Sequence, residues 1–224
     1  MRRISMSDRR AAPRTDPRKI AQIVAGHKFH TIISKPRGLL RVEIGFGESS
    51  GQQQALYADF AVVPIHNLTL NASFALIHGR YTSFPDAPYY PPVTASSCSP
   101  SVGAVGACTI DAAGLNTVHT PSFTMHLSAD YVKPTQVGPF DIAADFYHND
   151  GFYWDPANQV RQPTYSLYNA SIGWMNPPER FGIRLWGKNL RGAKYYSNAS
   201  TSTLGELFSP APPRTYGGTI SARF

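Results

Sequence analysis

The sequence of 224 residues has little charge, only two cysteines and no long apolar segment. Asp, Glu, Lys and Arg make up 16% of it, whereas a typical soluble domain carries about 25%. A bundle of transmembrane helices is excluded, because no run of about 20 apolar residues is present and the mean hydropathy is −0.26. Gly and Pro, at 18 and 19 residues, are too few for a low-complexity chain. Aromatic residues, by contrast, reach 12%.

Positive charge is concentrated at the N-terminus. Residues 1–38 contain ten Lys and Arg against two Asp, whereas residues 39–224 contain eleven Lys and Arg against twelve acidic residues. The net charge of +7 therefore belongs to the first 38 residues. We expect them to form a basic tail without regular structure, although a basic arm can also bind nucleic acid or anionic lipid. Because residues 39–224 lack a basic excess, no nucleic acid is expected as a partner.

The basic tail does not have the pattern of a secretory signal peptide. Arg2 and Arg3 could imitate the basic start of such a signal. No uninterrupted apolar region follows, and Pro13 and Pro17 break the candidate stretch. We therefore expect no signal peptide in this segment.

From residue 39 onward, apolar residues recur at every second position, which is the period of a strand with two unlike faces. All but one of these runs are longer than the 5–6 residues common in globular strands, and they approach the roughly 9–11 residues of tilted membrane-spanning strands. The pattern predicts an all-β chain, with residues 39–224 forming a partial antiparallel up-and-down transmembrane β-barrel of about eight strands. The runs lie at residues 40–46, 56–62, 68–76, 123–131, 140–146, 168–174, 181–185 and 216–224.

The connections between these runs alternate between short and long. Outer-membrane barrels have short periplasmic turns and long extracellular loops, whereas a soluble meander has no reason to sort its loops in this way. The predicted short turns are 64–67, 134–137 and 175–180, and the predicted long connections are 47–54, 79–120, 149–164 and 190–213.

Tyr and Trp residues gather near the ends of the runs. Interfacial girdles of membrane barrels place aromatic rings there, although aromatic residues are also common in β-proteins generally. We interpret the following residues as a girdle: Tyr81, Tyr131, Tyr147, Tyr153, Trp154, Trp174, Tyr195, Tyr196 and Tyr216.

The two cysteines, Cys98 and Cys108, lie in the longest predicted loop. A pair this close in an exposed loop suits a disulfide in an oxidising compartment, and closing so small a ring would contribute about 2–3 kcal/mol. The alternatives are two unrelated thiols or half of a metal site. No second pair of cysteines exists to complete a zinc site.

No other cluster points to catalysis or to a cofactor. His27 and His30 could share a helical face, but no carboxylate or cysteine accompanies them. Asp141 and Asp145 lie four residues apart on one predicted strand and therefore on one face, where a polar wall is favoured over acid–base chemistry. Nucleophile-elbow, P-loop and dinucleotide motifs are lacking. We expect no enzyme, no cofactor and no metal site.

The last 60 residues contain a set of motifs in a fixed order. The stretch YNASIGW at 168–174 precedes FGIRLWGKNL at 181–190, a Tyr-Tyr pair, PPRTYG at 212–217 and a terminal Arg-Phe. This set resembles the C-terminal end of the barrel of TonB-dependent outer-membrane receptors, and residues 67–84 resemble an earlier hairpin of it. The residues that carry the resemblance are Asn189, Leu190, Tyr195, Tyr196, Pro213, Arg214, Tyr216, Gly217, Ile220 and Phe224.

The resemblance, which covers about residues 54–224, implies an outer-membrane location in a Gram-negative cell and uptake of a siderophore or similar nutrient by the complete protein. It also implies that the last strand, ending at Phe224, is the signal read by the barrel assembly machinery. The expected partners are therefore outer-membrane lipid and that machinery.

The sequence departs from complete receptors of this family, which have an energy-coupling box, a plug domain and a barrel of about 22 strands. Nothing before Leu39 reads as a plug. The sequence therefore predicts a receptor fragment that does not transport alone and that engages the TonB system only if a plug is supplied elsewhere.

Two other functions remain open at this point. An autonomous eight-stranded outer-membrane barrel could act as an adhesin or a structural protein, because eight strands can close. A soluble β-barrel binder is less favoured, because it would place its apolar faces inward and carry a charged exterior, whereas residues 39–224 carry little charge.

Overall fold

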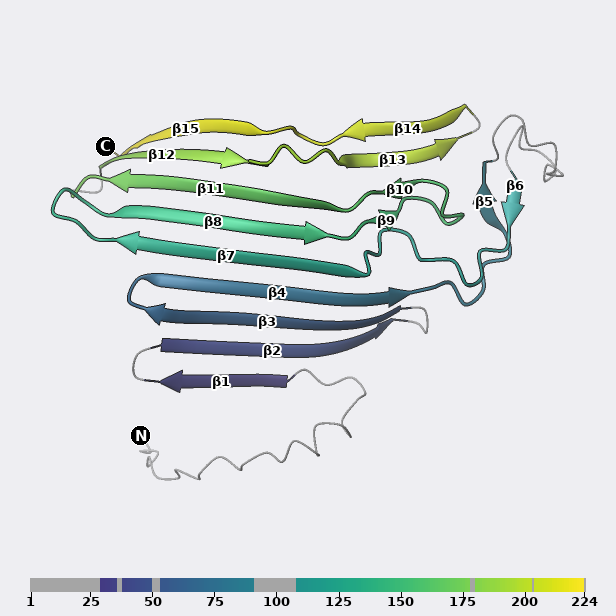
Figure 1. Cartoon of the computed structure of the whole chain (residues 1–224), viewed down its shortest axis with the longest axis horizontal. Coiled ribbons are helices and arrows are strands. Elements are labelled where there is room, and N and C mark those ends of the chain that lie inside the picture. The colour runs from purple at the N-terminus through teal and green to yellow at the C-terminus, as the bar shows by residue number, and fades with distance from the viewer. Residues whose placement is uncertain are drawn as a thin grey trace, which may run out of the picture.

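The computed structural model describes residues 29–35, 38–49, 53–90, 108–177, 180–202 and 204–223, with side chains from Gln54 onward. These residues form an all-β structure dominated by one sheet of nine strands, in which every neighbouring pair is antiparallel (Figure 1). In spatial order the strands are β1 (Phe29–Lys35), β2 (Gly38–Ser49), β3 (Gln53–Ile65), β4 (Leu68–Gly79), β7 (Phe123–Lys133), β8 (Phe140–Asn149), β11 (Tyr165–Met175), β12 (Phe181–Lys188) and β15 (Thr215–Ala222).

From β3 onward, strands that follow one another in the sheet are joined by short turns at one end and by long loops at the other, as Figure 1 shows. The loops carry three small two-stranded sheets of their own. The predicted sorting is confirmed for the three turns and for the connections β4–β7, β8–β11 and β12–β15, but not for the connection between β2 and β3. The loop strands are β5 (Ala87–Tyr89), β6 (Cys108–Ile110), β9 (Phe152–Tyr153), β10 (Arg161–Gln162), β13 (Tyr196–Ser202) and β14 (Gly205–Pro210).

Two predicted boundaries differ from the structure. The connection expected at 47–54 is short, because Gly47, Glu48 and Ser49 continue the ladder opposite Ala55, Gln54 and Gln53. The predicted irregular tail of residues 1–38 contains β1, which pairs with β2 from Phe29–Ile44 to Lys35–Gly38. Charge composition does not report strand pairing, and β1 is a strand of only seven residues. Residues 1–28 lie outside the described part of the chain.

The register of the sheet keeps two faces separate across the strands. Ala72 lies opposite Phe60 on one side and Leu127 on the other, while Ser73 lies opposite Asp59 and His126. Because side chains alternate along a strand, the apolar set points to one side of the sheet and the polar set to the other. The apolar set occupies the even positions of β3, β4 and β8 and the odd positions of β7 and β12. The alternation predicted from the sequence is therefore confirmed, and we call the two sides the apolar face and the polar face.

The sheet does not close within the described residues, where β1 and β15 each pair with one neighbour only. Large apolar side chains remain exposed on its apolar face, including Leu76 at 52%, Leu185 at 57% and Ile220 at 72%. The part of the chain that the structure describes contains no helix long and apolar enough to cross a bilayer.

Candidate ligand-facing surface

The polar face carries a ladder of side-chain hydrogen bonds between neighbouring strands. Asn71 donates from Nδ2 to Ser128 Oγ at 3.1 Å, and Asn169 donates from Nδ2 to Asp145 Oδ2 at 2.7 Å. The Oδ1 atom of Asn169 accepts the backbone N–H of Asn189 at 2.8 Å. These bonds fix polar groups that register alone would only bring close.

The two carboxylates predicted to share a face have different partners. Asp141 Oδ2 lies 2.7 Å from the Arg184 guanidinium, and both side chains are partly exposed. The Asp141 carboxylate occupies the space where a side chain at Gly173 would begin, so this glycine allows the close approach. Since Asp145 is held by Asn169, the pair forms a polar wall rather than two carboxyl groups facing one substrate.

A group of tyrosines lies where the polar face meets the loops. The rings of Tyr165 and Tyr195 stack nearly parallel, with centroids 4.5 Å apart and an interplanar angle of 9°. Tyr147 is 6.0 Å from Tyr165, and its hydroxyl accepts a hydrogen bond from Asn149 Nδ2 at 3.0 Å. Tyr147 and Tyr195 were interpreted as girdle residues, but Tyr147 lies on the polar face. The alternation along the sequence could have predicted this, because Tyr147 is two positions from Asp145 and therefore lies on the same face of the strand.

Above the tyrosines, the long loops are tied together by amide side chains of the β9–β10 hairpin. Gln159 accepts the Tyr90 N–H at 3.2 Å and donates to the Tyr90 carbonyl at 2.8 Å. Asn158 repeats this pattern with Asn116, at 3.0 and 2.9 Å. The wholly buried Gln162 accepts the backbone N–H of Tyr196 at 3.1 Å. One hairpin thus holds the loops on both of its sides.

An aromatic cluster completes this region, which we call the loop cluster (residues 80–90, 108–122, 150–164, 189–202 and 204–214). The His119 ring packs edge-on against Phe152 at 5.5 Å and Trp154 at 5.0 Å. Two buried polar atoms, Trp154 Nε1 and Asp150 Oδ1, have no hydrogen-bond partner among the described residues. Buried unpartnered polar atoms are uncommon, so these two are exceptions in an otherwise well-bonded cluster.

The motif residues Asn189 and Leu190 end β12. Asn189 is buried and has a φ of 50°, a left-handed conformation that Asn tolerates better than most residues. Its side chain accepts the Ala193 N–H at 2.8 Å and donates to the Ala193 carbonyl at 2.9 Å. Leu190 returns to the sheet through its N–H, which donates to the Tyr168 carbonyl at 2.8 Å. The motif therefore builds the turn into the last loop.

The other motif residues are spread over both faces and the loops. Tyr195 stacks on Tyr165, and the Tyr196 ring contacts Phe208 at 4.6 Å. Gly217 lies under the Trp186 ring, whereas Tyr216 and Ile220 are exposed on the apolar face at 66% and 72%. Pro213 and Arg214 are exposed before β15. Their predicted role in assembly stays a prediction, and Phe224 lies outside the described residues.

The predicted disulfide also stays a prediction. Cys108 is buried at the start of β6, where it lies opposite Tyr89. Cys98 lies outside the described residues. No group of three or more His, Cys, Asp or Glu in the described part of the chain has a geometry that could hold a metal ion.

Solved structures of uptake receptors share this fold. The chain superposes on the ferric yersiniabactin uptake receptor FyuA from Yersinia pestis with a TM-score of 0.60 and 17% identity, covering 88% of this chain and 29% of that one. The siderophore receptor PiuA from Acinetobacter baumannii gives 0.61 and 15%, covering 87% and 28%. The ferric preacinetobactin receptor BauA from the same organism gives 0.54 and 13%, with the same coverage. No family model matches the sequence.

The chain thus spans less than a third of the length of these receptors. At such identities the likeness establishes the fold and not the ligand. It agrees with the resemblance found in the last 60 residues and with the order of strands and loops. The described sheet has the fold of part of a TonB-dependent receptor barrel.

Proposed function

We propose that this chain forms part of the wall and extracellular surface of an outer-membrane receptor that takes up a siderophore or a similar nutrient. The observation that carries the proposal is the likeness of the sheet to solved structures of siderophore uptake receptors, and the C-terminal motifs of the sequence support it. In this arrangement the turns face the periplasm. The loop cluster, with Cys108, faces the outside.

The exposed apolar face supports placement in a bilayer. Removing apolar surface from water is favourable by about 25 cal/mol per Å², and the described residues supply no second layer to cover this face. The polar face then lines the interior of the barrel. Outer-membrane lipid and the barrel assembly machinery are the partners that this placement requires.

Transport requires more than the described strands. In lipid each unpaired backbone group costs several kcal/mol, so the free edges of β1 and β15 need partner strands. We propose that the sheet works within a larger barrel, and that the TonB system engages it only when a plug is supplied. By itself the chain is not transport-competent.

The ligand-facing part is the tyrosine group on the polar face together with the loop cluster. Aromatic rings and amides at the mouth of a barrel offer stacking surfaces and hydrogen-bond groups to an extracellular ligand. The rigid ties from Asn158, Gln159 and Gln162 keep this surface ordered. No catalytic role is proposed for any of these residues.

Fractionation and uptake measurements test this proposal. The full chain, expressed with an added signal peptide in a receptor-deficient Gram-negative host, should sediment with outer membranes and resist extraction by carbonate. It should not restore uptake of a ferric siderophore. Recovery in the soluble fraction would contradict the membrane placement, and restored energy-dependent uptake by the chain alone would contradict its incompleteness.

A further inference from the structure

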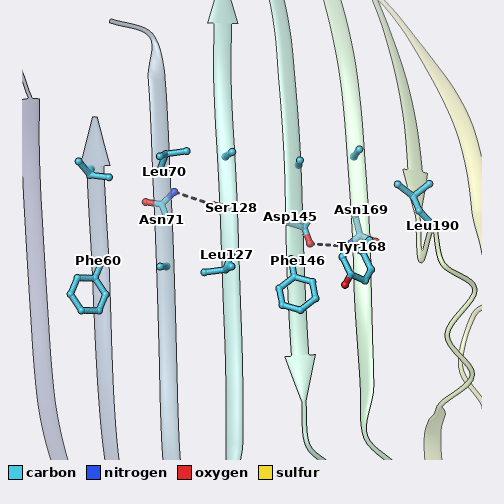
Figure 2. Close-up of a pocket in the computed structure, with 15 residues that line it drawn as sticks. Phe60, Leu70, Asn71, Leu127, Ser128, Asp145, Phe146, Tyr168, Asn169 and Leu190 are labelled. Atoms are coloured by element: carbon cyan, nitrogen blue, oxygen red, sulfur yellow. Dashed lines mark hydrogen bonds between the residues drawn. The ribbon is translucent and has the colours of Figure 1, made fainter. Parts of the chain in front are cut away.

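A hollow lies on the apolar face of the sheet (Figure 2). Its volume is about 700 Å³. Its floor consists of alanines, three of which, Ala129, Ala144 and Ala170, lie directly opposite one another on β7, β8 and β11. Larger side chains surround this floor, namely Phe60, Val62, Leu70, Leu127, Phe146, Tyr168 and Leu190.

The walls of this apolar hollow are placed by the same register that separates the two faces. Leu127, Phe146 and Tyr168 are consecutive neighbours across three strands, one step toward the loops from the alanines. Phe146 and Tyr168 are in ring contact at 4.8 Å. Ala144 and Ala170 remain exposed. The hollow is therefore open to whatever covers the apolar face.

A cation lies at the loop-side margin of the hollow. The Arg191 guanidinium lies 4.9 Å from the centre of the Tyr168 ring, and its Nη1 donates to the Tyr168 hydroxyl at 3.3 Å. Tyr168 is itself a wall of the hollow. The charge is thus held beside an apolar surface, at the end of the strand where a membrane interface would lie.

A second guanidinium, that of Arg214, lies beside Gly192, the residue that follows Arg191. Arg214 approaches Gly192 so closely that an added Cβ there would be 3.1 Å from its Nη2. Neither arginine forms an ion pair with a carboxylate among the described residues, whereas Arg184 pairs with Asp141. The segment 189–214 contains three basic residues and one acidic residue. A segment with more basic than acidic residues favours an anion.

We propose that the apolar hollow binds a membrane lipid with a phosphate headgroup, with an acyl chain on the alanine floor and the phosphate at Arg191. The proposal rests on the bilayer placement proposed above. A flexible acyl chain fits a floor of alanine methyl groups, because the side chains of the polar lining residues Asn71, Ser128, Asp145 and Asn169 belong to the polar face of the strands. The charge at the margin complements a phosphate, and basic residues at a membrane surface favour anionic lipids.

Lipid titration of the purified, delipidated full chain, followed by native mass spectrometry, tests the proposal. The probes are phosphatidylglycerol and phosphatidylcholine with identical acyl chains. Wild type should prefer phosphatidylglycerol. Arg191→Gln should lower the affinity for that lipid by about five-fold, to the affinity for phosphatidylcholine. The control Arg180→Gln removes an exposed cation at the opposite end of β12 and should leave the preference unchanged.

A second pair of variants tests the hollow itself. Ala170→Phe fills the floor and should lower the affinity for both lipids. Ala58→Phe enlarges an apolar-face residue outside the hollow and should change neither affinity. If Ala170→Phe does not assemble, Ala144→Phe blocks the same floor from the neighbouring strand.

Three outcomes would overturn the proposal. They are equal lipid binding by the wild type and the floor variant, a headgroup preference that persists in Arg191→Gln, and dimers in place of lipid adducts that the floor variant abolishes. Membrane fractionation separates this failure from that of the proposed function. If the chain sediments with membranes but its lipid binding is unchanged by these substitutions, only the lipid site is contradicted. If the chain remains soluble, both proposals are contradicted.

Discussion

Buried apolar side chains lie in the loops of this protein rather than in its sheet. All five buried hydrophobic residues of the described part, Ala87, Cys108, Ala112, Val160 and Ala199, belong to the loop cluster. The sheet instead exposes Leu185 and Ile220 on its apolar face. The sheet is therefore built for an apolar surrounding, whereas the loop cluster holds itself together in water.

The two regions also use hydrogen bonds differently. In the sheet, the backbone ladder satisfies the polar groups, and side chains add a few bonds on the polar face, such as Asn169 to Asp145. In the loop cluster the ladders are short, and amide side chains connect them and the loops between them, as Gln159 does at Tyr90. Substitutions on the apolar face should therefore affect insertion, and substitutions of the amides should affect local order.

The largest expected effect comes from placing a charge on the apolar face. Ala72→Arg should block membrane assembly, at a cost of about 2–4 kcal/mol near the bilayer midplane. Ser73→Arg is the matched control, because it places the same side chain on the polar face of the same strand. Assembly is measured as the carbonate-resistant fraction. Equal losses for both variants would mean that the faces are reversed or not in lipid.

The loop disulfide is expected to have the next largest effect. Cys98 and Cys108 should be bonded to each other, and Cys108→Ser should lower the stability of the loop by about 2–3 kcal/mol. Mass spectrometry of unreduced peptides should show the loss of two hydrogens, about 2 Da, in protein from an oxidising compartment. Alkylation of both thiols without prior reduction would refute this prediction.

Removing the buried amide of Gln162 should loosen the last loop and leave the sheet intact. Gln162→Leu leaves the Tyr196 N–H without its partner, which costs about 1–3 kcal/mol. Hydrogen exchange at Tyr196 and along β13 should accelerate, while exchange in β8 and β11 stays unchanged. Uniform acceleration across β8, β11 and β13 would show that the two regions are not separable.

The ion pair on the polar face should have the smallest effect. Arg184→Met removes the partner of Asp141, but both side chains are partly exposed, at 53% and 38%. Exposed pairs contribute about 0–1 kcal/mol. The midpoint of urea unfolding in detergent should therefore shift little. A loss comparable to that of Ala72→Arg would show that the interior of the barrel is much drier than these exposures indicate.

The sequence predicted the sheet well because its signal is local. Alternation along β4 and β7 places Ala72 and Leu127 on one face regardless of what surrounds them. Short turns, such as the one at Asn67 with its φ of 63°, also depend on neighbouring residues only. The face assignments, and the loop sorting apart from the connection at 47–54, could therefore be predicted without a structure.

Only the tertiary structure revealed β1, the tyrosine group and the ties within the loop cluster. Gln159 and Tyr90 are 69 positions apart, and nothing near either residue indicates the other. Arg191 at the margin of the alanine floor likewise depends on register across β7, β8 and β11. Period-two alternation is a property of one strand, whereas a contact between loops is fixed by the packing of every strand between them.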